Sequence, residues 1–230
     1  MSPTIFAIAF VSGLVPALFW LWFWLREDKK NPEPFHLIAI TFIAGMAVVP
    51  LALPLQKLAM EIYTEDNLYW SWVIIEEVLK YAVAVAVILW NRAVDEPIDM
   101  IIYMITIALG FAALENALFL VTPLIAGDYI NSALTGSFRF LGATLLHVLA
   151  SGTVGIFLAF AFYKSNFVRI CYGMIGLCIA IVLHALFNFF IMNNESGETI
   201  LMVFLFVWIG IIMLFLVFEK VKHLESSSSR

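Results

Sequence analysis

The chain contains seven apolar runs, each long enough to cross about 30 Å of bilayer hydrocarbon as a helix. They lie at roughly 5–25, 35–60, 69–90, 98–126, 137–163, 168–192 and 200–218. With 63% hydrophobic and 13% charged residues, the chain has too few charges to cover a water-soluble surface. The sequence therefore predicts an all-α polytopic membrane protein, a bundle of about seven transmembrane helices.

The connections between these runs indicate a single domain. Segments such as REDKKNPEP and NRAVDEP are short, charged and proline-bearing, as turns between helices are. We expect one transmembrane domain over residues 1–223 and interpret the serine-rich tail at 224–230 as an expression scar. Within the second run, Pro50 and Pro54 predict a helix that is kinked or broken near its outer end.

The basic residues predict the orientation of the bundle. If the N-terminus is outside, eight basic residues fall in cytoplasmic segments, whereas the outer loops hold only Lys57. The eight are Arg26, Lys29, Lys30, Arg92, Lys164, Arg169, Lys220 and Lys222. Because cytoplasmic loops of membrane proteins carry an excess of Lys and Arg, we expect the N-terminus outside and the C-terminus in the cytoplasm.

Five ionisable residues inside the runs share a depth. At 1.5 Å of rise per residue, Glu76, Glu77, Glu115, His147 and His184 all lie roughly 9–15 Å below the expected outer surface, on four helices. A charge at the centre of a bilayer costs on the order of 3 kcal/mol by insertion scales. Five titratable groups at one depth exceed what helix packing needs, so we predict a polar functional site in the outer half of the membrane.

Further polar residues lie within reach of this cluster. Lys80 follows Glu76 by four positions and Glu77 by three, so it can neutralise either carboxylate. Arg139, near the outer start of the fifth run, is interpreted either as a snorkelling residue or as a group that binds a substrate carbonyl or carboxylate. The residues expected to support the cluster are Lys80, Arg139, Asn116 and Ser151.

This combination of groups suits hydrolysis of an acyl bond away from bulk water. A glutamate can activate water, and a histidine can share that water or protonate the leaving amine. Asn188 lies one helical turn from His184, and the two can donate to an oxyanion. The candidate catalytic residues are therefore Glu76, Glu77, Glu115, His147, His184 and Asn188.

A metal-dependent mechanism is the alternative. Glu115, His147 and His184 form a set of two histidines and one carboxylate that suits Zn²⁺ and leaves a fourth position for water. The chain has no HExxH, so the familiar zinc-protease helix is absent. The sequence leaves both mechanisms open, as it does the choice between Glu76 and Glu77 as the base.

Four sequence blocks, in this order, resemble the signature blocks of the PrsW family of bacterial intramembrane proteases. They are EEVLK, DEPIDMIIYMITIALGFAALENALFLV, FRFLGATLLHVLASGTVG and LHALFNFF, and KNPEPFHLI is similar to the usual first cytoplasmic loop of that family. The resemblance covers roughly residues 5–215. The family is distantly similar to the CAAX prenyl endopeptidases, with their EExxxR, FxxxH and HxxxN pattern. Here Lys80 comes one position early, and Phe111 is followed by Glu115 instead of histidine.

The resemblance implies an endopeptidase embedded in the cell membrane. Its substrate would be a single-span membrane protein of the anti-sigma factor kind, which receives its first cut near the extracytoplasmic side as part of a stress response. The implied site residues are Glu76 and Glu77 from the EExxK block, Glu115 from the next block, and His147 and His184. Besides this substrate, the implied partner is the lipid bilayer, and no nucleic acid is expected.

Two other classes of protein also place acids and histidines inside a membrane. A proton-coupled transporter needs such groups, but we find no inverted repeat and no paired Gly/Pro-broken helices in two halves. A non-catalytic scaffold or immunity-type member would keep the fold without the reaction. The retained Glu76, Glu115, His147 and His184 favour an enzyme over both.

Overall fold

The computed structural model describes residues 3–27, 31–193 and 197–228, and these residues form helices and no strand. The elements are α1 (Pro3–Glu27), α2 (Phe35–Ile62), α3 (Glu65–Val87), α4 (Pro97–Ile125), α5 (Tyr129–Phe138), the π-helix η1 (Arg139–Ala143), α6 (Thr144–Phe160), α7 (Asn166–Asn193) and α8 (Gly197–Ser228). Because α5, η1 and α6 follow one another without a break, the described chain amounts to seven helices. The predicted all-α architecture is confirmed.

Six of these helices are long and apolar enough to cross a membrane: α1, α2, α4, the continuous helix at 129–160, α7 and α8. The seventh, α3, has 23 residues but carries Glu76, Glu77 and Lys80 on its inner part. All three side chains are buried in the bundle. The charges that lower the hydropathy of α3 are therefore covered by neighbouring helices.

The helix boundaries differ from the sequence prediction at three places. Helix α2 runs without interruption through Pro50 and Pro54, so the chain does not break there. The fifth helix begins at Tyr129 rather than near 137, because α5 extends it on the N-terminal side. The serine-rich tail continues α8 as a helix to Ser228, and residues 229–230 lie outside the described part of the chain.

Helix α4 forms the centre of the bundle, with α1, α2 and α6 packed against it. The crossing of α2 and α4 depends on two glycines. A Cβ atom on Gly45 would lie 2.2 Å from the carbonyl oxygen of Ile107, and one on Gly110 would lie 2.0 Å from that of Phe42. Only residues without a side chain permit this approach, as in other membrane helix pairs that pack through small residues. The crossing fixes α2 closely against α4.

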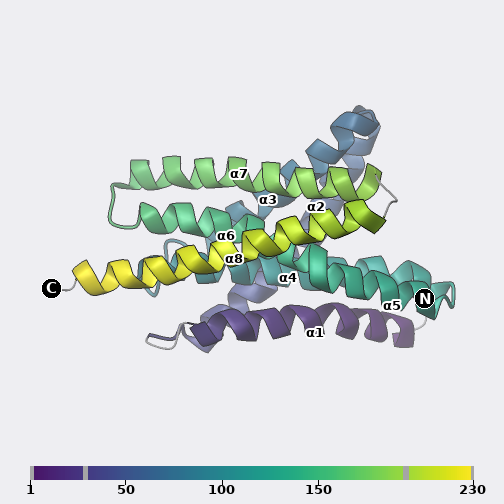
Figure 1. The fold of residues 1–230 in the computed structure, drawn as a ribbon, viewed down its shortest axis with the longest axis horizontal. Coiled ribbons are helices and arrows are strands. Elements are labelled where there is room, and N and C mark those ends of the chain that lie inside the picture. The colour runs from purple at the N-terminus through teal and green to yellow at the C-terminus, as the bar shows by residue number, and fades with distance from the viewer. Residues whose placement is uncertain (1–2, 28–30, 194–196, 229–230) are drawn as a thin grey trace.

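The two ends of the chain lie at opposite ends of the bundle, as an odd number of crossings requires. In Figure 1, α1 starts at one end, and α8 finishes at the other, where the connection between α6 and α7 also lies. Which end faces the cytoplasm stays a prediction from the basic residues, of which Lys29 and Lys30 lie outside the described residues.

Cysteine labelling tests this orientation. Ser165 lies in the exposed connection between α6 and α7, and Thr64 lies in the exposed connection between α2 and α3. In a Cys171→Ser, Cys178→Ser background, we expect a membrane-impermeant maleimide to label Thr64→Cys in intact cells, because this connection is predicted to face outward. Ser165→Cys should react only after permeabilisation. Labelling of Ser165→Cys in intact cells, with Thr64→Cys protected, would reverse the orientation.

Candidate active site

The polar residues of α3 form a buried ion pair. The Nζ of Lys80 lies 2.5 Å from Oε1 of Glu77, and both side chains are almost inaccessible to solvent. The ammonium also lies 4.6 Å from the ring centroid of Phe111 on α4, where a cation is attracted to the ring face. Of the two glutamates within its reach on α3, Lys80 is paired with Glu77.

His184, on α7, bridges the two glutamates of α3. Its Nδ1 lies 2.7 Å from Oε1 of Glu77, and its Nε2 lies 3.8 Å from Oε2 of Glu76. An ionised carboxylate only accepts hydrogen bonds, so in a neutral ring Nδ1–H donates to Glu77. The lone pair of His184 is then on Nε2, facing Glu76.

His147, on α6, joins α3 to α4. Its Nδ1 lies 3.2 Å from Nζ of Lys80, and its Nε2 lies 3.1 Å from Oε2 of Glu115. Because an ammonium group only donates, Nδ1 accepts and Nε2–H donates to Glu115. The rings of His147 and His184 stand edge to face with their centroids 5.0 Å apart. Side chains from α3, α4, α6 and α7 therefore meet in one cluster, as their shared depth predicts.

Arg139 connects this cluster to η1, inside the continuous helix at 129–160. Its guanidinium donates to Oε2 of Glu115 and, through Nε, to Oδ1 of Asn116 at 2.6 Å. It also lies 3.8 Å from the ring centroid of Phe119, and Nδ2 of Asn116 donates to Thr144. Arg139 is the first residue of the π-helix η1, a widened helical turn of the kind that often occurs at functional sites.

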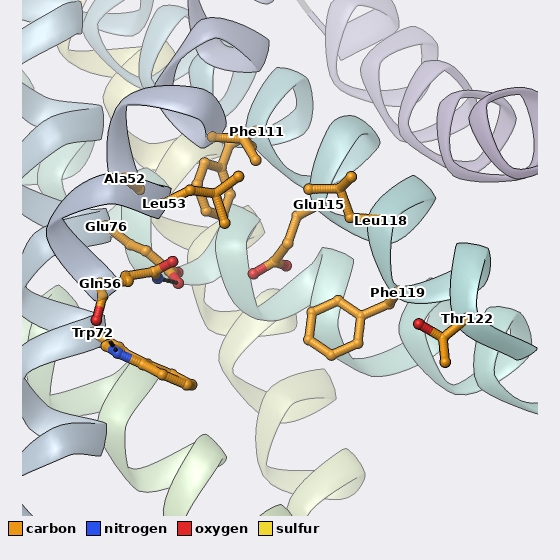
Figure 2. A pocket seen from close by; sticks show the side chains of 11 residues that line it. Ala52, Leu53, Gln56, Trp72, Glu76, Phe111, Glu115, Leu118, Phe119 and Thr122 are labelled. Atoms are coloured by element: carbon orange, nitrogen blue, oxygen red, sulfur yellow. Dashed lines mark hydrogen bonds between the residues drawn. The ribbon is translucent and has the colours of Figure 1, made fainter. Parts of the chain in front are cut away.

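A pocket of about 450 Å³ opens between α2, α3 and α4 beside the cluster. Figure 2 shows Gln56 and Glu76 on one side of it, and Glu115 and Phe119 on the other. The two carboxylates line the pocket, whereas His147 and His184 are not among its lining residues and lie deeper in the bundle. The pocket is thus lined mainly by apolar side chains and by two acidic groups, each of which lies close to a buried histidine.

The chain matches a known protein family over most of its length. Residues 33–216 match the family described as PrsW family intramembrane metalloprotease. This chain belongs to the PrsW family. It is therefore an intramembrane protease and a multi-pass membrane protein.

Curated members of the PrsW family align with most of the chain. Protease PrsW of Clostridioides difficile is 28% identical over 205 residues, which cover 84% of this chain and 83% of that protein. Protease PrsW of Oceanobacillus iheyensis is 28% identical over 206 residues, or 86% and 90% of the two chains. That of Bacillus subtilis is 24% identical over 202 residues, or 86% and 89%. No solved structure matches.

The family is described as one of metalloproteases, and a metal ion would need a set of ligand side chains. Among the described residues, one group of three has ligand atoms within 4.8 Å of one another: Glu76, His147 and His184. The sequence suggests Glu115 as the carboxylate of such a set. In the structure, Glu115 instead contacts Arg139 and His147. Glu76 is the carboxylate whose oxygen lies near nitrogen atoms of both His147 and His184.

Three residues complete the account of the site in this PrsW-family protein. Ser151 is fully buried one helical turn after His147 on α6, and its hydroxyl has no hydrogen-bond partner among the described residues. Asn188 is half-buried one turn beyond His184, and no hydrogen bond joins it to the cluster within the described chain. Gln56, which the sequence reasoning missed, donates to Glu76. It is the only glutamine in the chain, and its place in an apolar run is the signal that marks it.

Proposed function

We propose that this protein cleaves a peptide bond of a single-span membrane protein near the extracytoplasmic side, using a zinc ion held by Glu76, His147 and His184. The observation that carries the proposal is the approach of these three side chains to within 4.8 Å at a pocket between α2, α3 and α4. The substrate class suggested by the family resemblance is an anti-sigma factor, which would receive its first cut here. The predicted orientation puts the pocket in the outer half of the bilayer.

The donor chemistry of the three residues fits zinc. Two imidazoles and one carboxylate are a common catalytic set that leaves a position for water. Oε2 of Glu76 is buried without a hydrogen-bond partner among the residues that the structure describes, which is costly unless something binds it. The lone pair of His184 faces this oxygen. His147 has a partner on each nitrogen, so its ligation would replace either the contact with Lys80 or that with Glu115.

A zinc ion at this position would polarise the scissile carbonyl and acidify a water molecule. The neighbouring side chains of the chain orient the groups that would hold it. Glu77 fixes the tautomer of His184 by accepting from Nδ1–H, a support that histidine ligands usually have. Lys80 is paired with Glu77 and balances its charge.

Glu115 and Phe119 line the opposite side of the pocket, and Arg139 contacts both of them without being a lining residue itself. The guanidinium neutralises Glu115, and the pair lies beside the apolar ring of Phe119. The Arg139 side chain stays partly exposed beside Glu115, and its remaining N–H donors suit the carbonyl oxygens of an extended peptide that reaches them. Without a metal, Glu76 and His184 would remain the pair able to activate water.

Metal analysis combined with a cleavage assay decides between these mechanisms. We expect purified protein in detergent to contain about one zinc ion per chain and to cut a fluorogenic single-span peptide. A chelator should stop the cleavage, and added zinc should restore it. His184→Ala should lose both the zinc and the activity, whereas His36→Ala, an exposed histidine at the start of α2, should keep both.

The remaining outcomes separate the alternatives. Cleavage that persists in the chelator, by protein that contains no zinc, would establish the metal-free mechanism with Glu76 as the base. Protein that binds zinc but cuts no member of a library of single-span peptides would contradict the proposed endopeptidase activity. In that case a transport or scaffold function would be the better account.

A further inference from the structure

We infer that Gln56 is a positioning residue for Glu76, one that fixes which carboxylate oxygen faces the histidines. This inference deepens the proposed function, and it rests on that function for its kinetic consequences. It concerns a neutral side chain on α2, the helix that contributes neither a histidine nor an acid to the cluster.

The hydrogen bonds of Glu76 divide its two oxygens. Nε2 of Gln56 donates to Oε1 at 2.8 Å. Oε2 is buried, has no hydrogen-bond partner in the described part of the chain, and lies 3.8 Å from Nε2 of His184. Because a carboxylate can rotate about its last bond, nothing in Glu76 itself distinguishes the two oxygens. The amide removes this freedom by holding Oε1, and it leaves Oε2 as the oxygen available to a metal or a water molecule.

The two adjacent glutamates are held by different chemistry. Glu77 is paired with a cation, Lys80, at 2.5 Å. Glu76 receives a neutral amide donor, which orients the carboxylate but does not cancel its charge. A carboxylate that must bind a cation or take a proton has to keep its negative charge. The choice of glutamine in place of a basic residue therefore favours Glu76 over Glu77 as the reactive acid.

The backbone around Gln56 is held in place from two sides. The indole Nε1 of Trp72, on α3, lies 3.2 Å from the carbonyl oxygen of Gln56. Eleven positions earlier, the close crossing through Gly45 and Gly110 fixes α2 on α4. Helix α2 therefore presents the amide from a supported position, as a residue that orients a reactive group requires.

The kinetic test uses Gln56→Met, which keeps the length of the side chain and removes the amide. The control is Leu58→Met, an exposed position on the same helix outside the pocket. We expect Gln56→Met to lower kcat by about 10- to 100-fold, the usual effect of losing a partner of a reactive or metal-binding carboxylate. KM should change by less than about threefold, because Gln56 acts on Glu76 and not on the substrate.

Three results would overturn the inference. A rise in KM at unchanged kcat would assign Gln56 to substrate binding. Wild-type values of both constants would leave the amide without a role. A lower thermal midpoint with unchanged activity per folded molecule would make the contact merely structural. Leu58→Met should match the wild-type protein in all three measurements.

A spectroscopic test is independent of catalysis. Since Gln56 is the only glutamine, protein made with glutamine labelled at the side-chain nitrogen has a single glutamine amide signal by NMR in detergent. Glu76→Ala should shift the amide proton that donates to Glu76 toward the position of an unbonded amide, whereas Glu61→Ala, at an exposed position on the same helix, should not. Unchanged spectra in Glu76→Ala would overturn the inference even if the wild-type protein cleaves peptides. If the wild-type protein is inactive but the shift is seen, the proposed function fails and the contact stands.

Discussion

Glu76→Gln is expected to lower kcat/KM for peptide cleavage by about a thousandfold, within the range for loss of a general base or an acidic ligand. Glutamine has nearly the same shape, so the bundle should still assemble. Its amide cannot take a proton from water, and it is a poor ligand compared with a carboxylate. Cleavage of a fluorogenic single-span peptide by purified protein, normalised to the folded fraction, measures the effect.

The matched control is Glu61→Gln, an exposed acid at the C-terminal end of α2. It changes the same charge near the same surface and should alter cleavage by less than about twofold, because exposed charges interact weakly with distant sites. A Glu76→Gln protein that cuts at the wild-type rate, beside an inactive Glu77→Gln protein, would exchange the roles of the two glutamates.

Lys80→Met should lower cleavage by about 100-fold while the protein still inserts into the membrane. Lys80 is fully buried and contacts Glu77 and His147. Removing one partner of a buried pair leaves an uncompensated charge, at a cost of about 3–5 kcal/mol. Without the ammonium, Glu77 loses the cation that balances it, and Nδ1 of His147 loses its donor. The measurement is the cleavage rate together with the yield of membrane-inserted protein.

Adding Glu77→Gln to Lys80→Met should restore part of the activity. The second change removes the unpaired charge, and the amide oxygen of the new glutamine can still accept from Nδ1–H of His184. Lys57→Met, an exposed lysine on α2, is the control for loss of a positive charge. Wild-type cleavage by Lys80→Met would show that the lysine has no electrostatic role, and a double variant less active than Lys80→Met would contradict the charge argument.

Much of the architecture could be predicted from the sequence because a bilayer restricts what the backbone can do. Long apolar runs have to be helices, since only a helix satisfies its own hydrogen bonds in hydrocarbon. The meeting of the site residues at one depth has a related cause. Helices that cross the same slab bring residues of equal depth to the same level, so Glu76, Glu115, His147 and His184 meet even though they are far apart in sequence.

Depth does not say how each helix is rotated about its axis, and this limited the prediction of the metal group. Glu76 and Glu115 lie at one level, but only the packed bundle decides which of them faces the space between the two imidazoles. That carboxylate is Glu76, whereas Glu115 forms an ion pair with Arg139. The position of Arg139 depends in turn on the π-helix η1, which changes the register of side chains and has no clear sequence signature.

Gln56 escaped the sequence reasoning for a different reason. A search for charges and metal ligands passes over a neutral amide, although an amide in hydrocarbon also needs a partner. Its partner, Glu76, lies on the next helix, and the pairing depends on how α2 and α3 pack together. A search for the hydrogen-bond partner of each amide side chain within an apolar run would have included Gln56.

The size of the pocket also limits the shape of any peptide that reaches Glu76. One turn of an α-helix, about 10 Å across and 5.4 Å long, occupies about 420 Å³. The pocket measures about 450 Å³, whereas a spanning helix is about 30 Å long. The pocket therefore has room for about one turn of a spanning helix, so only a short stretch of a substrate can lie beside Glu76 at one time. The position of the scissile bond would then depend on which short stretch can enter the pocket as much as on side-chain fit.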